Sequence, residues 1–313
     1  MIQFLNDVLA GLRNEPKRLD SKYFYNEEGD RLFQQIMALP EYYLTNCEME
    51  ILQSQKKEIA KKVLGYACPL DLVELGPGDA AKSIFLIKEF YSRGALNHFY
   101  PIDISQNITD HLNEKLPALV PGLEIRAING EYFESLGNLK SDPLTKKLVL
   151  FLGANIGNIP LEKADSFYKK LHSLLSDGDL VLTGFDLKKH PKKILTAYDD
   201  ASGVTAQFNL NLLRRINTEL GADFILDQFE HYAQYDPVSG ACKSYLVSLQ
   251  KQEVRLHDSV INFERDECIL VEVSQKYSLM QIDALAETSG FETVEHFFDS
   301  KKYFSDVLWI CRK

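Results

Sequence analysis

The stretch Leu70-Asp-Leu-Val-Glu-Leu-Gly-Pro-Gly-Asp79 decides the fold of this chain. Its apolar half is typical of a buried strand, and its glycines come just before a helical pattern. A second strand run begins at Lys147 and leads into Phe151-Leu-Gly-Ala-Asn-Ile-Gly-Asn158, which stops at Pro160. Strands that end in glycine-rich turns build the ligand crevice of an open α/β sheet, at the carboxyl ends of the strands. The sequence therefore predicts a nucleotide-like cofactor with polar groups beside it.

Strand and helix patterns alternate on both sides of these turns. Residues 1–63 are mostly helical in pattern, and the alternation starts at Leu70. Short connections between alternating strands and helices predict a parallel sheet. The predicted parallel strands are 70–75, 98–102, 123–128, 147–152 and 179–184.

The alternation breaks after the fifth strand. A long amphipathic helical region covers 192–221, and antiparallel strands are expected within 224–273. A last helix at 278–289 precedes two closing strands, 291–297 and 306–312. This order suits an α/β fold, the Rossmann-like seven-stranded sheet of class I methyltransferases, with a second, inserted α+β domain.

Composition and charge exclude several classes of protein. The chain has 313 residues, is 45% hydrophobic, and carries a net charge of −10, which disfavours a nucleic-acid partner. Its five cysteines are dispersed and have no metal-ligand spacing, so we expect no metal and no disulfide. The N-terminal stretch has Asp7 among its apolar residues and lacks a basic start, so we expect no signal peptide. No apolar run approaches ~20 residues, so we expect no membrane helix. We therefore expect a cytoplasmic protein.

The first glycine turn favours one cofactor over others. Glu74-Leu-Gly-Pro-Gly78 is similar to the S-adenosylmethionine loop, in which glycines let the backbone approach the ligand closely. Ala81 replaces the third glycine of a dinucleotide loop, and no Gly-Lys-Ser follows. Asp103 ends the next predicted strand and suits the ribose hydroxyls. Glu131 and Tyr132 follow the strand after that and suit the adenine. We predict S-adenosylmethionine rather than a nicotinamide cofactor.

Further motifs identify a resemblance that covers nearly the whole chain in order. The chain resembles the ergothioneine-pathway L-histidine Nα-methyltransferases, which are histidine-specific and S-adenosylmethionine-dependent. Beside the two glycine turns, the motifs are Lys22-Tyr-Phe-Tyr-Asn26, Leu39-Pro-Glu-Tyr-Tyr43, Phe185-Asp-Leu-Lys-Lys189, Ala197-Tyr-Asp-Asp-Ala201, Gly203-Val-Thr-Ala206, Phe208-Asn-Leu-Asn-Leu-Leu213, Glu219-Leu-Gly-Ala-Asp223 and Glu272-Val-Ser274.

The resemblance implies roles for individual residues. Tyr25 and Asn158 are implied as catalytic, and they hold the amino-acid end of the substrate together with Tyr42 and Tyr198. Glu272 and Ser274 hold the imidazole, and Ser244 stands where the family commonly has a methionine that lines the imidazole pocket. The implied cofactor contacts are Gly76, Gly78, Lys82, Asp103, Glu131 and Tyr132.

The spacing of Glu272 and Ser274 favours histidine as the substrate. Residues two apart on a strand face the same way. A carboxylate and a hydroxyl match the two imidazole nitrogens, whereas indole offers a single N–H. Methylation of another amino acid such as tryptophan or a derivative is the alternative, kept open by Ser244. A cofactor-binding protein without catalysis is a third hypothesis.

The expected reaction is trimethylation of L-histidine to its betaine, hercynine. We expect residues 51–190 plus 277–313 to bind S-adenosylmethionine, and residues 1–50 plus 191–276 to bind the substrate. The partners are then a small amino acid and no membrane or nucleic acid, and we expect a monomer. The seven histidines show no metal-ligand spacing, and we interpret them as structural.

Overall fold

The computed structural model describes residues 2–139 and 145–313, and it divides into two compact units. Unit 1 comprises Met1–Tyr43 and Lys188–Lys276, and unit 2 comprises Leu44–Leu187 and Tyr277–Lys313. Each unit has its own cluster of buried apolar side chains. The chain thus passes between the units at three places, near residues 43, 187 and 276.

Unit 2 contains a mixed sheet whose order is β13-β14-β7-β6-β2-β3-β4, with β5 also paired to β3. The strands β2, β3, β4, β5, β6 and β7 all pair with one another in parallel, and β14 runs antiparallel to both β7 and β13. This arrangement is the class I methyltransferase fold that the sequence predicts. The strands are β2 Leu70–Leu75, β3 Leu96–Asp103, β4 Glu124–Ile125, β5 Ile128–Asn129, β6 Lys146–Phe151, β7 Leu180–Asp186, β13 Phe291–Phe298 and β14 Phe304–Cys311.

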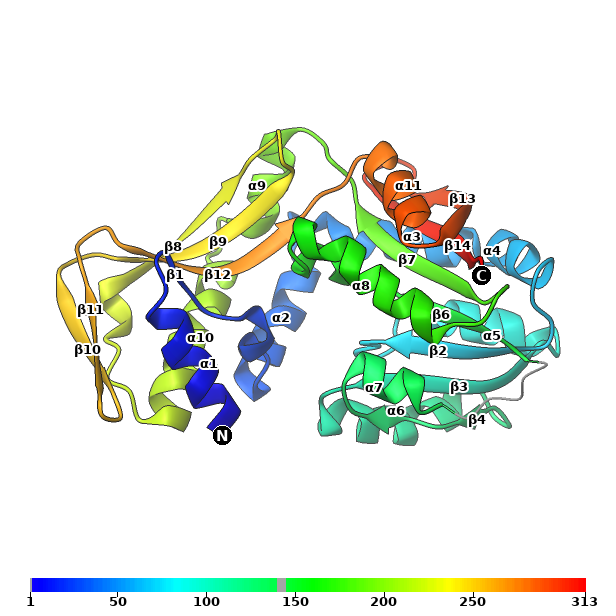
Figure 1. The fold of residues 1–313 in the computed structure, drawn as a ribbon, viewed down its shortest axis with the longest axis horizontal. Helices are drawn as coiled ribbons and strands as arrows, with labels where there is room; N and C mark the ends of the chain where they lie inside the picture. The colour runs from blue at the N-terminus through cyan, green and yellow to red at the C-terminus, as the bar shows by residue number, and fades with distance from the viewer. Residues whose placement is uncertain (1, 140–144) are drawn as a thin grey trace. The chain divides into compact units, whose positions relative to one another are not determined.

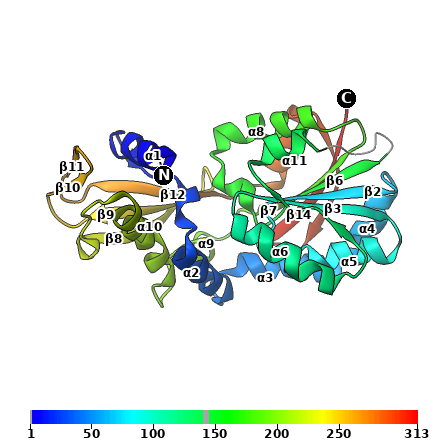
Figure 2. The same cartoon turned by 90° about the horizontal axis from the view of Figure 1, so that it is seen from below.

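Helices cover both faces of this sheet. Figure 2 shows the sheet nearly edge-on, with α8 and α11 on one side and α5 and α6 on the other. The central strands are buried along their whole length, as expected for a sheet covered on both faces. The helices are α3 Tyr43–Ser54, α4 Lys56–Leu64, α5 Ile84–Ser92, α6 Gln106–Leu119, α7 Tyr132–Gly137, the 3₁₀ helix η2 Asn155–Asn158, α8 Leu161–Leu174 and α11 Leu279–Thr288.

The structure differs from the prediction in the third strand. The expected strand 123–128 is two short pieces, β4 and β5, that both pair with β3. Between them, the backbone N–H of Arg126 donates to Phe99 O, and its guanidinium turns to Glu124 and to the hydroxyl of Tyr100. Because of this split, the sheet contains eight strands among the described residues instead of seven.

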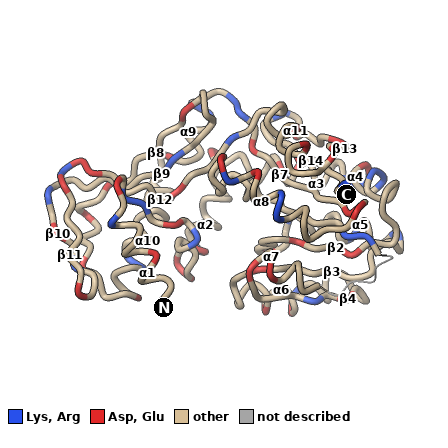
Figure 3. Tube along the Cα trace, viewed as in Figure 1, with Lys and Arg blue, Asp and Glu red and all other residues tan. Residues whose placement is uncertain are grey.

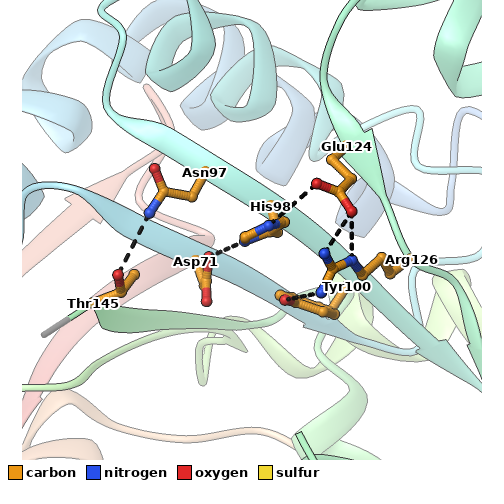
Figure 4. Close-up of polar contacts among 7 residues, drawn as sticks. All are labelled: Asp71, Asn97, His98, Tyr100, Glu124, Arg126 and Thr145. Carbon is orange, nitrogen blue, oxygen red and sulfur yellow. Dashed lines mark hydrogen bonds and ion pairs between the residues drawn. The ribbon is translucent and has the colours of Figure 1, made fainter. Parts of the chain in front are cut away.

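A polar network joins the strands near the start of β2 and β3 (Figure 4). His98 lies between two carboxylates, with Nδ1 2.8 Å from Asp71 and Nε2 3.3 Å from Glu124. Glu124 also accepts from Arg126, whose guanidinium donates to the Tyr100 hydroxyl at 3.3 Å. In a parallel sheet, ligands bind at the carboxyl ends of the strands. This network lies at the opposite, amino ends. These contacts fit the structural role predicted for His98.

Unit 1 is built on a four-stranded sheet of order β1-β12-β9-β8, and β10 pairs with β11. The helix α10 packs on β8 and β9, and α2 packs on α10 (Figure 1). The strands are β1 Lys17–Arg18, β8 Phe229–Tyr235, β9 Ala241–Ser248, β10 Gln252–Leu256, β11 Ser259–Phe263 and β12 Cys268–Gln275. The helices are α1 Ile2–Leu12, α2 Glu27–Ala38, α9 Pro191–Tyr198, α10 Val204–Leu220 and the 3₁₀ helices η1 Ser21–Phe24 and η3 Leu226–Gln228.

The helical region expected at 192–221 is interrupted. It forms α9 and α10, separated by the residues around Asp200. The Asp200 carboxylate accepts the backbone N–H groups of Val204 and Thr205 at 3.0 and 2.8 Å. It therefore caps the start of α10, where helical N–H groups have no partner within the helix. Against the opposing effect of burial, the Ser202 hydroxyl and these backbone bonds lower the pKa of Asp200 to about 2.

Two observations bear on the predicted class of protein. Acidic and basic residues are interspersed along the traces of both units (Figure 3). None of the helices in the described part of the chain combines the length and the apolar character needed to cross a membrane.

Candidate active site

The turn after β2 requires glycine. Gly76 and Gly78 have φ of +70° and +54°. A Cβ added to Gly76 would lie 2.6 Å from the Tyr132 hydroxyl and 3.4 Å from Asn155 Nδ2. The structure therefore brings three predicted cofactor residues, Gly76, Gly78 and Tyr132, to one region at the carboxyl end of β2. Sequence reasoning missed Asn155 as a neighbour of this turn, because it belongs to the distant second glycine-rich segment.

Lys82 is held by a carboxylate that the sequence analysis did not single out. Glu48, on α3, is 1% exposed and pairs through Oε2 with Lys82 Nζ. Its Oε1 accepts the backbone N–H of Gly153 at 2.7 Å. Glu48 thus connects the two glycine-rich turns of unit 2. The available signal was its place five residues after the end of Leu39-Pro-Glu-Tyr-Tyr43, a motif that the resemblance already used.

Two further buried acids accompany Lys82 in unit 2. Burial raises the pKa of Glu74 to about 8, against the opposing effects of Ser83 and Lys82. Burial and the nearby Glu48 also hold the pKa of Asp306 well above its ordinary range. Burial alone would lower the pKa of Lys82, but the paired Glu48 carboxylate raises it above its ordinary value, so the ammonium is maintained beside these acids.

The remaining predicted residues of unit 2 lie at ends of elements. Asp103 is the last residue of β3, is half-buried, and accepts the Ser105 N–H at 2.9 Å. Glu131 is exposed and precedes α7, which begins at Tyr132. Asn158 is exposed at the end of η2.

These residues suit the chemistry of S-adenosylmethionine. A positively charged Lys82 matches the cofactor's carboxylate, Asp103 matches a ribose diol, and the glycine turn leaves room where a side chain would clash. These residues therefore fit S-adenosylmethionine, and each assignment stays a prediction.

Unit 1 brings the predicted tyrosines together in an aromatic pocket. The ring centroids of Tyr42 and Tyr198 are 6.2 Å apart, and Phe33 lies 6.3 Å from Tyr42. Phe208 and Glu272 also line this pocket. Tyr25 packs edge-on against Phe208 at 5.9 Å and is 44% exposed. Unit 1 thus gathers Tyr42, Tyr198 and Glu272 around one aromatic pocket.

Two polar contacts join β12 to neighbouring elements at this pocket. The hydroxyl of Ser244 on β9 donates to Glu272 Oε2 at 3.3 Å, across a directly opposed pair of residues. Two residues further on, Ser274 Oγ lies 2.8 Å from the Tyr198 hydroxyl. All four side chains were predicted from sequence as substrate-binding, and unit 1 places them in two hydrogen-bonded pairs.

Two polar residues of unit 1 were missed. Lys276 is fully buried, and its Nζ donates to Ser274 Oγ at 2.8 Å and to the Tyr198 hydroxyl at 2.6 Å. The sequence showed it only as a lysine two residues after the Glu-Val-Ser motif. Asn209, on α10, is also fully buried, and its Oδ1 has no hydrogen-bond partner among the described residues.

The surroundings of the pocket favour the neutral form of Tyr42 and act in opposite directions on the pKa of Glu272. Burial, with the nearby Tyr198, raises the pKa of Tyr42 well above its ordinary value. Burial also raises the pKa of Glu272, while the Lys276 ammonium and the Ser244 hydroxyl lower it. Neutral hydroxyls can hydrogen-bond an amine or a carboxylate without placing a further charge in the pocket.

The histidine of β8 supports this wall. His231 Nε2 lies 3.0 Å from the backbone carbonyl of Tyr198, at the end of α9. It therefore holds the helix end that carries the tyrosine, in agreement with the structural role predicted for it.

Comparison with known proteins identifies the family. Residues 4–311 match the family described as histidine-specific methyltransferase, SAM-dependent. The chain is 36% identical to a histidine N-alpha-methyltransferase of Mycobacterium tuberculosis over 94% of this chain and 90% of that one. A protein of the same name from Mycolicibacterium smegmatis is 37% identical with the same coverage. Ergothioneine biosynthesis protein 1 of Schizosaccharomyces pombe is 29% identical over 90% of this chain and 37% of that longer protein. This chain therefore belongs to the S-adenosylmethionine-dependent, histidine-specific methyltransferases.

Proposed function

We propose that this protein methylates the α-amino group of L-histidine, taking the methyl groups from S-adenosylmethionine. The observation that carries the substrate is the pair Glu272 and Ser274, which share one face of β12 at the aromatic pocket of unit 1. A carboxylate and a hydroxyl complement the two nitrogens of imidazole, whereas indole would leave one of them without a partner. The family to which the chain belongs supports the same assignment.

Bound S-adenosylmethionine supplies an activated methyl group, so the protein's task is to orient a neutral amine and exclude water. We assign Gly76, Gly78, Lys82, Asp103, Glu131 and Tyr132 of unit 2 to the cofactor. The hydroxyls of Tyr25, Tyr42 and Tyr198 in unit 1 suit the substrate's carboxylate and amine, because they can bind both groups without adding a charge. We assign Asn158 a hydrogen bond to the substrate's amine.

We further propose that one pocket adds all three methyl groups. Each methylation makes the amine bulkier, and the product is a permanent cation. The faces of Tyr42 and Tyr198 attract such a cation without requiring it to donate hydrogen bonds. The monomeric state, the cytoplasmic location and the absence of a nucleic-acid partner stay predictions.

The test is to incubate the purified protein with S-adenosylmethionine and each free amino acid, and to follow products by mass spectrometry. We expect a gain of three methyl groups on histidine. Methylation of tryptophan instead would refute the assignment of Glu272 and Ser274 to an imidazole ring. The absence of product with every amino acid would refute the proposed catalysis.

Matched variants test whether Glu272 carries the selectivity. Glu272→Gln should raise KM for histidine roughly tenfold to a hundredfold, the value of a hydrogen bond to a charged group. The control is Glu230→Gln, which changes an exposed glutamate on β8 of the same sheet and should leave KM unchanged. Equal KM in both variants would contradict the role of Glu272.

A further inference from the structure

A buried ammonium contacts Ser274, one of the two residues that we propose to bind the imidazole ring. Lys276 is 0% exposed, and its Nζ donates to Ser274 Oγ at 2.8 Å and to the Tyr198 hydroxyl at 2.6 Å. It also lies 4.4 Å from the centroid of the Tyr198 ring. Burying a charge is costly unless its partners compensate. An ammonium that contacts two predicted substrate-binding hydroxyls calls for a reason beyond packing.

The ammonium determines how Ser274 can interact with a ligand. A serine hydroxyl has one hydrogen to donate and two acceptor positions, whereas an ammonium only donates. Lys276 therefore occupies one acceptor position of Ser274. The Tyr198 hydroxyl, 2.8 Å away, is a phenol and hence the more acidic partner, so it donates to the second position. Ser274 then has its own hydrogen to offer to a ligand, and acts as a donor.

The same charge acts in the opposite sense on Glu272. Burial favours the protonated, neutral form of this carboxyl, and the positive charge of Lys276 opposes that effect. The Ser244 hydroxyl, 3.3 Å from Oε2, also stabilises the carboxylate. An ionised carboxylate accepts hydrogen bonds and donates none. One lysine thus favours a donor at Ser274 and an acceptor at Glu272.

We propose that Lys276 is a positioning residue for substrate selection, which makes Ser274 a donor and Glu272 an acceptor toward the substrate ring. The inference rests on the proposed function, in which this pair holds the ring. The pair then selects a ring with one N–H and one unprotonated nitrogen, which is neutral imidazole. Imidazolium offers two N–H groups and indole offers one N–H without an acceptor, so each leaves a mismatch at Ser274.

The first experiment uses the unaltered protein with S-adenosylhomocysteine present, and measures amino-acid affinity by calorimetry. The probes are L-histidine, 2-thienylalanine, 4-thiazolylalanine and 5-thiazolylalanine. Thienylalanine has a five-membered ring without nitrogen, and each thiazolylalanine adds one acceptor nitrogen at one of the two imidazole positions. Because Ser274 donates, one of the two thiazolylalanines should bind about tenfold tighter than thienylalanine, the value of one good hydrogen bond. Equal affinities of all three analogues would overturn the proposal.

Variants then assign the effect to the lysine. Lys276→Met removes the ammonium and keeps the length of the chain, and should reduce the preference for histidine over thienylalanine about tenfold. Lys276→Gln keeps N–H donors without the charge, and should lose less of that preference. The control is Lys243→Met, since Lys243 lies on β9 next to Ser244 and its side chain faces the other side of the sheet.

The outcomes separate the lysine's role from the function itself. If folded Lys276→Met binds histidine and thienylalanine with equally weakened affinity, Lys276 is a structural residue and the proposal is wrong. If Lys276→Met does not fold, the Lys276→Gln variant and the thiazolylalanine comparison decide the question. If the unaltered protein methylates some other amino acid, the proposed function fails, independently of what the variants show. A larger change in KM than in kcat for histidine would support positioning.

Discussion

Replacing Glu74 by glutamine should remove a pH dependence from the stability of unit 2. Burial raises the pKa of Glu74 to about 8 in the folded protein, against an ordinary value of 4.5. Between these values the folded state holds a proton that the unfolded state has lost. The stability due to Glu74 is therefore complete below pH 4.5, decreases as pH rises, and is lost above pH 8. Glutamine has a similar shape, cannot ionise, and should show no such decrease.

The size of the effect follows from linkage. A difference of one bound proton changes the free energy of unfolding by about 1.4 kcal/mol per pH unit. Between pH 6 and pH 8, the unaltered protein should therefore lose roughly 2 kcal/mol more than the Glu74→Gln variant, because Glu74 is half-ionised in the folded state at the upper limit. Other titrating groups contribute equally to both proteins and cancel in the difference.

The chain offers a specific probe for this measurement. Trp309 is its single tryptophan and is fully buried in β14 of unit 2. Urea unfolding followed by tryptophan fluorescence at pH 6 and pH 8 therefore reports on this unit. Glu162→Gln, an exposed substitution in the first turn of α8, is the control and should behave like the unaltered protein. Equal pH slopes in the unaltered protein and in Glu74→Gln would refute the reasoning.

Three further predictions follow from single contacts. Lys82→Met removes the cation that Glu48 pairs with and should lower the stability of unit 2 by about 3 kcal/mol, measured by tryptophan fluorescence; a loss below 1 kcal/mol would contradict this. Asp200→Ala removes the cap of α10 and should cost about 1–2 kcal/mol, measured by urea unfolding followed by circular dichroism, with unchanged stability as the contrary result. Ser244→Ala should weaken histidine binding several-fold in calorimetry, because Glu272 loses a donor; tighter binding would argue against that contact.

The parallel sheet of unit 2 could be predicted from sequence because its strands are short apolar runs bounded by glycine or proline. The strand 70–75 was predicted with its observed ends, because Pro69 precedes it and the glycine turn at Gly76 follows it. The third strand was predicted with less success. It lies at the edge of the sheet, where partial exposure admits polar residues such as Glu124 and Arg126, and their ion pair accompanies the break between β4 and β5.

The site was predictable where a motif is local and not where contacts are long-range. Glycines at positive φ and an acid at a strand end leave a mark within a few residues, as at Gly76 and Asp103. Glu48 and Lys82 are 34 residues apart, and Lys276 and Tyr198 are 78 apart. No spacing rule links such pairs, because only the fold brings them together. A buried lysine also reads in sequence as an ordinary surface residue.

The structure also changes how the departure at Ser244 is understood. A methionine at this position would make an apolar contact with the substrate ring. Serine cannot make that contact, and this difference left another amino acid open as the substrate. Ser244 is directly opposite Glu272 in the β9–β12 ladder and donates to its carboxylate. The pocket therefore exchanges an apolar contact for one more hydrogen bond to the acid. If Lys276 acts as proposed, selectivity for imidazole depends on the polarity that it imposes rather than on apolar fit, and a ring with the wrong donor pattern is rejected because it leaves a buried group unpaired.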